Sequence, residues 1–119
     1  MNMELSILGS AWIVEEKDVK SDDYLKDNYG YCDSSVRKIV VATLESVERE
    51  RKPDTAEDMA EVLGRAKRHE IIHAFLFESG LGFSSCGINA WAVNEEMVEW
   101  LAKQWPKIQR AFCEADCGT

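Results

Sequence analysis

Both histidines of the 119-residue chain lie in one short stretch, His69-Glu70-Ile71-Ile72-His73. Residues four apart project from the same face of a helix, so His69 and His73 could hold one zinc ion through their ring nitrogens. Glu70 would then point toward the position that stays open on the metal. The spacing predicts a zinc site with Glu70 as the catalytic general base for a metal-activated water.

A structural role is the alternative for the two histidines. A histidine on an apolar helix face is often a hydrogen-bonded part of the core. The core would then also bury Glu70, and a buried carboxylate without a partner is costly. Because a metal ion removes that cost, the sequence favours a metal site.

A catalytic zinc normally has three protein ligands, and the chain has no third histidine. A helix predicted over about residues 94–115, with Asn94 as N-cap, supplies acidic candidates. Its apolar stripe comprises Val98, Leu101, Ala102, Trp105, Ile108 and Phe112. Glu95 borders this stripe and is the predicted third ligand, whereas Glu96 falls toward the outside. Glu99 is placed to accept the ring N–H of a zinc-bound histidine. The alternative for Glu95 and Glu99 is a pair of solvated charges favoured by the helix dipole.

The first third of the chain predicts two antiparallel β-hairpins within about residues 4–43. Residues 5–8 and 11–14 flank a Gly9-Ser10 turn, and residues 36–43 are rich in β-branched side chains. Residues 15–28 between them are charged and polar and are expected to form a surface loop.

The active-site helix is predicted over about residues 54–79, with Asp54 as N-cap and Gly80 at its end. Beyond residue 70 apolar side chains surround this helix, which is typical of a buried helix. Residues 80–87 are glycine-rich and are expected to be a loop. Pro106 predicts a kink or break in the C-terminal helix. Together these elements indicate an α+β fold in a single domain over residues 1–119.

Composition restricts the partners. The net charge is −8, which has the wrong sign for attraction to phosphate backbones, so no nucleic acid is expected. No export signal or membrane-spanning apolar run is visible, which predicts a cytoplasmic protein without membrane contact. The four cysteines are therefore expected to be free thiols.

The two motifs together resemble the gluzincin metallopeptidases, in which a helix with H-E-x-x-H is followed by an N-E segment. Here these are His69 to His73 and Asn94-Glu95, with an acidic residue at Glu99. The second segment is also similar to the E-x-x-A-N-x-F-A segment of the ImmA/IrrE family, small metallopeptidases common in phages and mobile elements. The chain departs from it with Val98 for Ala, Glu99 for Asn and Leu101 for Phe.

This resemblance covers about residues 36–105 and implies a minimal zincin-like domain of a phage or prophage type that hydrolyses peptide bonds in a peptide or protein substrate. Larger relatives stabilise the oxyanion with a Tyr or a further His, and Tyr31 is the candidate donor here, with a packing aromatic as the alternative. An extended peptide could pair with residues 36–43 if that strand lies at the sheet edge beside the cleft, but an interior strand fits equally well.

Two other functions are open. Peptide deformylases combine H-E-x-x-H with an upstream cysteine ligand, and Cys32 lies upstream of His69, although the other deformylase segments are missing. A zinc-stabilised binding or antirepressor-like module would hold a partner without cleaving it. The presence of Glu70 argues against such a module, because a purely structural site needs no base.

Overall fold

The computed structural model describes residues 2–87 and 90–118 and has a mixed α+β architecture. Its strands are β1 (Asn2–Ile7), β2 (Ser10–Lys17), β3 (Gly30–Asp33) and β4 (Lys38–Ala42). The helices are α1 (Leu25–Asn28), α2 (Leu44–Arg49), α3 (Met59–Glu78), α4 (Leu81–Ser84) and α5 (Glu95–Glu114), with two 3-10 turns, η1 (Val19–Ser21) and η2 (Trp91–Val93). In the described part of the chain, no helix is long and apolar enough to cross a membrane.

The four strands form one sheet in the order β1-β2-β4-β3. Both predicted hairpins are confirmed, because β1 pairs antiparallel with β2 and β3 pairs antiparallel with β4. The hairpins are joined by a parallel pairing of β2 with β4, which places Val14 opposite Ile39. β4 is therefore an interior strand, and the edge strand on its side of the sheet is β3.

The expected surface loop over residues 15–28 is wrong in part. β2 continues to Lys17, and η1 and α1 follow it. The reason is that Val19 and Leu25, the apolar residues of this polar stretch, are buried in a core cluster with Val40 and Met59. Burial of these two side chains folds the segment against the domain.

The active-site helix begins later than predicted, at Met59, and its N-cap is Asp58 rather than Asp54. The Asp58 carboxylate accepts the backbone N–H of Glu61 at 3.1 Å. The preceding residues form turns instead of helix, because the Arg51 guanidinium donates to the backbone carbonyls of Ala56 and Glu57. Those carbonyls are thereby held outside a helical ladder.

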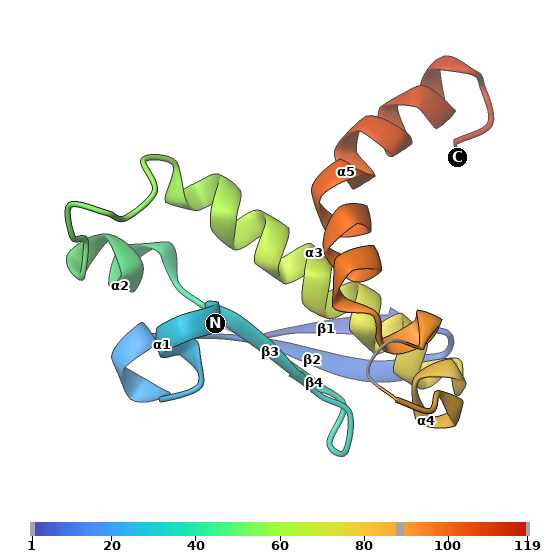
Figure 1. Cartoon of the computed structure of the whole chain (residues 1–119), viewed down its shortest axis with the longest axis horizontal. Coiled ribbons are helices and arrows are strands. Elements are labelled where there is room, and N and C mark those ends of the chain that lie inside the picture. The colour runs from blue at the N-terminus through green and yellow to red at the C-terminus, as the bar shows by residue number, and fades with distance from the viewer. Residues whose placement is uncertain (1, 88–89, 119) are drawn as a thin grey trace.

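The prediction that this helix is buried on all sides is also wrong. Met59, Leu63 and Ala74 are its buried residues, while Phe75 is 42% exposed. α3 lies across one face of the sheet (Figure 1). α5 packs on the side of α3 that faces away from the sheet, and it covers only part of the length of α3. The rest of α3 therefore keeps a solvent-facing side.

The C-terminal helix begins as predicted, with the Asn94 side chain accepting the N–H of Met97 at 2.8 Å. It continues through Pro106 without a break, and Figure 1 shows its axis bending along the way. The predicted apolar stripe is buried only near its start, at Val98 and Ala102, whereas Trp105 and Phe112 are 42% and 43% exposed. Beyond its crossing with α3 the helix projects from the domain (Figure 1), which explains this exposure. The expected loop over residues 80–87 contains the short helix α4.

The end of α3 is attached to the sheet by a partly exposed polar contact that makes stability depend on pH. Glu78 accepts the indole N–H of the buried Trp12 at 2.7 Å and pairs with Arg37 at 2.7 Å. The Arg37 pair, followed by the Trp12 bond, lowers the pKa of Glu78 from 4.5 to about 2. A lowered pKa stabilises the fold above the ordinary value, and that contribution is lost as the pH falls from about 4.5 toward 2.

We therefore expect Glu78→Gln to be less stable than the wild type at pH 6, with the difference shrinking as the pH approaches 2. Urea unfolding followed by circular dichroism at several pH values measures this. Glu4→Gln, at an exposed position of β1, is the matched control and should show no such convergence. A Glu78→Gln curve parallel to the wild type at every pH would contradict this assignment.

Candidate metal centre

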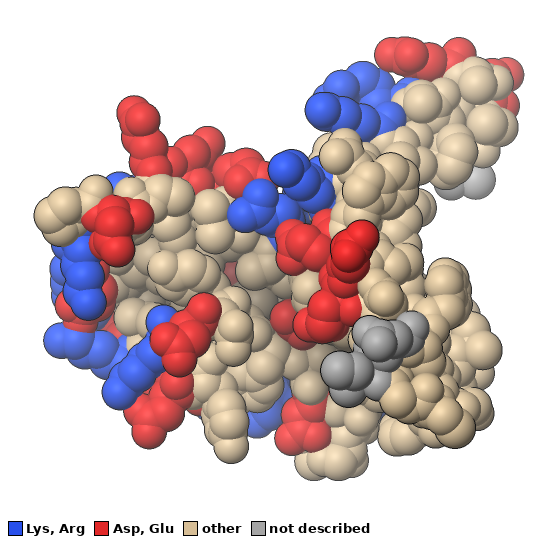
Figure 2. Space-filling view, viewed as in Figure 1, with Lys and Arg blue, Asp and Glu red and all other residues tan. Residues whose placement is uncertain are grey.

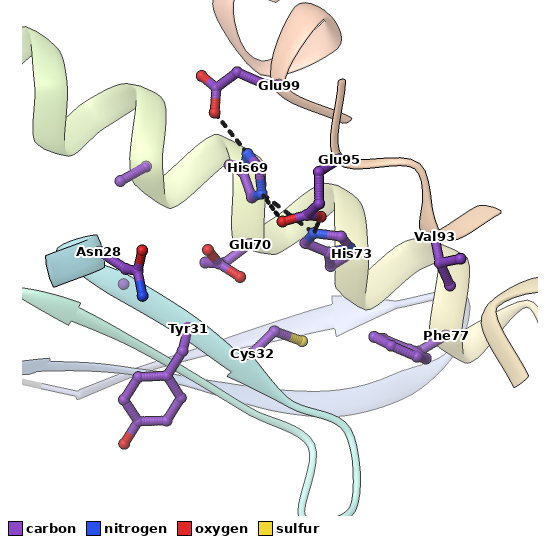
Figure 3. Close-up of a pocket in the computed structure, with 12 residues that line it drawn as sticks. Asn28, Tyr31, Cys32, His69, Glu70, His73, Phe77, Val93, Glu95 and Glu99 are labelled. Atoms are coloured by element: carbon purple, nitrogen blue, oxygen red, sulfur yellow. Dashed lines mark hydrogen bonds and ion pairs between the residues drawn. The ribbon is translucent and has the colours of Figure 1, made fainter. Parts of the chain in front are cut away.

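Two helices bring the three predicted ligands together. His69 and His73 lie on successive turns of α3, and Glu95 is the first residue of α5. One possible ligand atom from each of these residues lies within 4.8 Å of the others. Figure 3 shows the carboxylate of Glu95 reaching down to both rings. The cluster of His69, His73 and Glu95 predicted from the sequence is thus present as a group in space.

The distances within the cluster are short. Nε2 of His73 lies 2.6 Å from Oε1 of Glu95, and Nε2 of His69 lies 3.5 Å from Oε2. The two Nε2 atoms are 3.2 Å apart. Both rings are largely shielded from solvent, whereas Glu95 is 69% exposed. The three side chains therefore converge on one point from two elements.

The outer partner of His69 is also where the sequence predicts it. Nδ1 of His69 lies 2.8 Å from Oε2 of Glu99, one turn after Glu95. The other Glu99 oxygen lies 3.3 Å from Nε of Arg65, which holds the carboxylate in place. With its Nδ1 proton donated to Glu99, His69 would present the lone pair of Nε2 to the cluster.

The donor set fits zinc. Two imidazole nitrogens and one carboxylate oxygen are the ligand types of a catalytic zinc, and three protein ligands leave a position open. Burial lowers the pKa of His73, which favours the neutral ring that a metal ligand requires. Without an ion, the same contacts form a hydrogen-bonded group in which a histidine proton is shared with Glu95.

Glu70 faces the same space from α3 (Figure 3). Burial is the main cause that raises its pKa to about 7, and the charges of Glu95 and Glu99 add to the effect. Gly30 of β3 lies against this side chain: a Cβ at Gly30 would lie 3.5 Å from Cγ of Glu70 and 3.2 Å from the backbone oxygen of Val40. The missing side chain lets the edge strand approach the helix closely.

These residues line a cleft of about 660 Å³ between α3, the start of α5 and β3. The other lining residues include Asn28, Tyr31 and Cys32 on the strand side and Phe77 and Val93 at one end. Acidic side chains gather at the base of α5, next to the opening (Figure 2). The cleft is therefore a negatively charged space suited to a cation.

Tyr31 is not placed for the role expected of it. Its hydroxyl donates to Oδ2 of Asp22 at 2.6 Å and points away from the histidines (Figure 3). Burial, followed by the bond to Asp22, raises the pKa of Tyr31. Only the body of its side chain belongs to the cleft, so the alternative of a packing aromatic describes it better.

Cys32 lines the cleft but is not one of the clustered ligands. Burial, with the nearby charge of Glu70, raises the pKa of its thiol to about 12. A deformylase-type site needs this sulfur among the metal ligands, and the described cluster is formed without it. The geometry thus favours Glu95 over Cys32 as the third ligand.

Parts of the cleft wall did not follow from the sequence. Asn28 lies in the stretch expected to be a surface loop, where nothing marked it as functional. Gly30 did carry a signal, because a glycine at the start of a strand often marks close approach of another group. Val93 lies in η2, an element that the sequence pattern did not indicate.

Comparison with protein-family models, with curated proteins and with solved structures finds no match for this chain. Its function must therefore be argued from the geometry of the cleft.

Proposed function

We propose that the chain is a zinc-dependent peptidase in which His69, His73 and Glu95 hold the metal and Glu70 is the general base. The observation that carries this proposal is the convergence of two Nε2 atoms from α3 and a carboxylate from α5, beside the half-buried carboxyl of Glu70 in the same cleft. Zinc bound there would polarise a carbonyl and lower the pKa of water toward about 7.

The chain's own residues supply the remaining steps. Glu70 would accept the proton of the attacking water and donate it to the leaving amine. Glu99 would keep His69 oriented, and Arg65 would keep Glu99 oriented. Asn28 is a neutral amide on the opposite wall from which a donor to the developing oxyanion can come.

The edge strand suits an extended substrate. Among the described strands β3 pairs with β4 alone, so its other edge keeps backbone groups available. Its residues Gly30, Tyr31 and Cys32 line the cleft opposite the histidines. A peptide paired with β3 would place its own backbone beside Glu70. We therefore place substrate pairing at β3 and not at residues 36–43, where the sequence suggested it. Pairing of this kind requires a peptide or protein substrate and not a nucleic acid.

One observation favours a second candidate, a zinc-stabilised binding or antirepressor-like module. The Tyr31 hydroxyl is bound to Asp22, and both histidines belong to the cluster. The described cleft thus lacks the Tyr or His oxyanion donor of larger zincins. Turnover separates the two functions, because both bind zinc.

The peptidase proposal predicts that cleavage of a peptide library requires zinc. Treatment with EDTA should stop cleavage, and one equivalent of zinc should restore it. Magnesium should not restore it, because it prefers oxygen ligands in octahedral geometry. Mass spectrometry of the library measures the products. Cleavage that continues unchanged in the metal-free chain would exclude the proposed function.

A further inference from the structure

One end of the cleft is formed by aromatic rings that continue from the metal cluster. Phe77 follows His73 by one turn of α3, and their ring centroids are 6.3 Å apart. Phe83 of α4 packs against Phe77, with ring centroids 5.4 Å apart. Val93 stands beside Phe77 in Figure 3. We call Phe77, Phe83 and Val93 the apolar wall.

The ring of Phe77 is held in position by a glycine. A Cβ on Gly82 would lie 2.7 Å from Cδ1 and 3.0 Å from Cε1 of Phe77. Since real side chains do not approach this closely, α4 can pack on the ring only because residue 82 has no side chain. The apolar wall is therefore a preformed surface, which lowers the entropy cost of binding.

The segment that carries Phe83 and Val93 contains no charged residue. Residues 79–94 contain no Asp, Glu, Lys or Arg, in a chain of which 30% is charged. Leu81, Phe83 and Trp91 in this stretch are 49%, 70% and 62% exposed. The surface over α4 is accordingly tan in Figure 2. Exposed large apolar side chains gathered in one place mark a binding surface.

The opposite end of the cleft is different. There the lining residues include the amide of Asn28 and the carboxyl of Glu70, and the acidic side chains of α5 border the opening. A substrate residue with a negative charge would be repelled on that side and would find no partner on the apolar wall. The two ends of the cleft thus distinguish substrates by polarity.

We infer that the apolar wall binds a large apolar side chain of the peptide substrate, next to the bond that is cut. The inference rests on the proposed function for the position of that bond, and it names peptides with Phe, Leu or Met at this position as the substrate class. Phe77 is the residue that determines this specificity, because its ring lines the cleft and lies between His73 of the metal cluster and Phe83 of the apolar wall.

Three hydroxamic acids test the inference by binding alone. Acetohydroxamic acid, phenylpropanohydroxamic acid and a hydroxamate ending in a carboxylate share one zinc-chelating group and differ in the attached chain. Titration calorimetry of the zinc-loaded Glu70→Gln chain should show phenylpropanohydroxamic acid binding at least about tenfold more tightly than acetohydroxamic acid, as expected for burial of a phenyl group. The carboxylate compound should show no gain.

Phe77→Ala should reduce this preference to near unity while zinc content and circular dichroism stay unchanged. Phe75→Ala removes the same ring two residues earlier on α3, outside the cleft, and should keep the full preference. If Phe77→Ala does not fold, Phe83→Ala replaces it, since Phe83 is largely exposed, and it should reduce the preference in part.

The outcomes separate the inference from the proposed function. Equal binding of acetohydroxamic and phenylpropanohydroxamic acids by the zinc-loaded Glu70→Gln chain, or a full preference when Phe77→Ala or Phe83→Ala is added to it, would overturn the inference and leave the peptidase proposal standing. A preference that depends on Phe77, in a chain that cleaves no peptide, would support the inference and leave a binding module. A chain that takes up no zinc would overturn both.

Discussion

Replacing Glu95 with alanine is expected to leave the purified chain almost without zinc. The substitution removes the only ligand that α5 contributes to the described cluster, so the ion would keep two ring nitrogens from one helix. Loss of an outer-shell partner alone typically lowers metal affinity about 10- to 100-fold, and loss of a direct ligand should exceed this. Competition with a chromogenic chelator measures the affinity, and elemental analysis measures the bound zinc.

Glu96→Ala is the matched control. It removes an identical side chain from the next position of the same helix turn, and Glu96 lies outside the cluster. This variant should hold zinc as the wild type does. Full zinc content in Glu95→Ala would mean that the third ligand is elsewhere, and Glu99 and Cys86 would then be the residues to replace.

Glu70→Gln is expected to lower peptide turnover by about 100- to 10 000-fold, the usual contribution of a general base. Glutamine keeps the size and the hydrogen-bonding oxygen of the side chain but cannot take the proton of an attacking water. Zinc uptake should not fall, because Glu70 is not one of the clustered ligands. Initial rates on a peptide that the wild type cleaves give the turnover.

Glu61→Gln controls for the loss of one negative charge from α3, since Glu61 lies in the first turn of that helix and away from the cleft lining. Its turnover should match the wild type. Equal, background-level turnover in the wild type and Glu70→Gln would remove the peptidase proposal and leave the zinc-stabilised module.

The candidate site could be predicted well because its signals are local. The four-residue spacing of His69 and His73 fixes their common face once a helix forms, and the position of Glu95 follows from the N-cap at Asn94. Tyr31 failed as a donor because its partner, Asp22, lies in a segment whose fold the sequence pattern did not reveal. A hydroxyl's direction depends on such tertiary contacts.

The fold was predictable only in part. Both hairpins follow from alternation and turn residues, but the parallel pairing of β2 with β4 joins strands far apart in sequence, which periodicity cannot detect. α2 was missed because residues 44–52 are mostly charged, although Thr43 caps it by accepting the N–H of Ser46. Buried contacts decided the remaining elements: Ser46 accepts the N–H of Val19, which joins α2 to η1.

The division of the ligands between α3 and α5 has a mechanical consequence. An ion bound by His73 and Glu95 would link α3 to α5. The link would close a loop around the segment between these residues, which includes α4, η2 and the apolar wall. Such a link acts as a reversible cross-link, in a chain whose cysteines form no disulfide. The order of the apolar wall and the free energy of unfolding would then both increase with the concentration of free zinc.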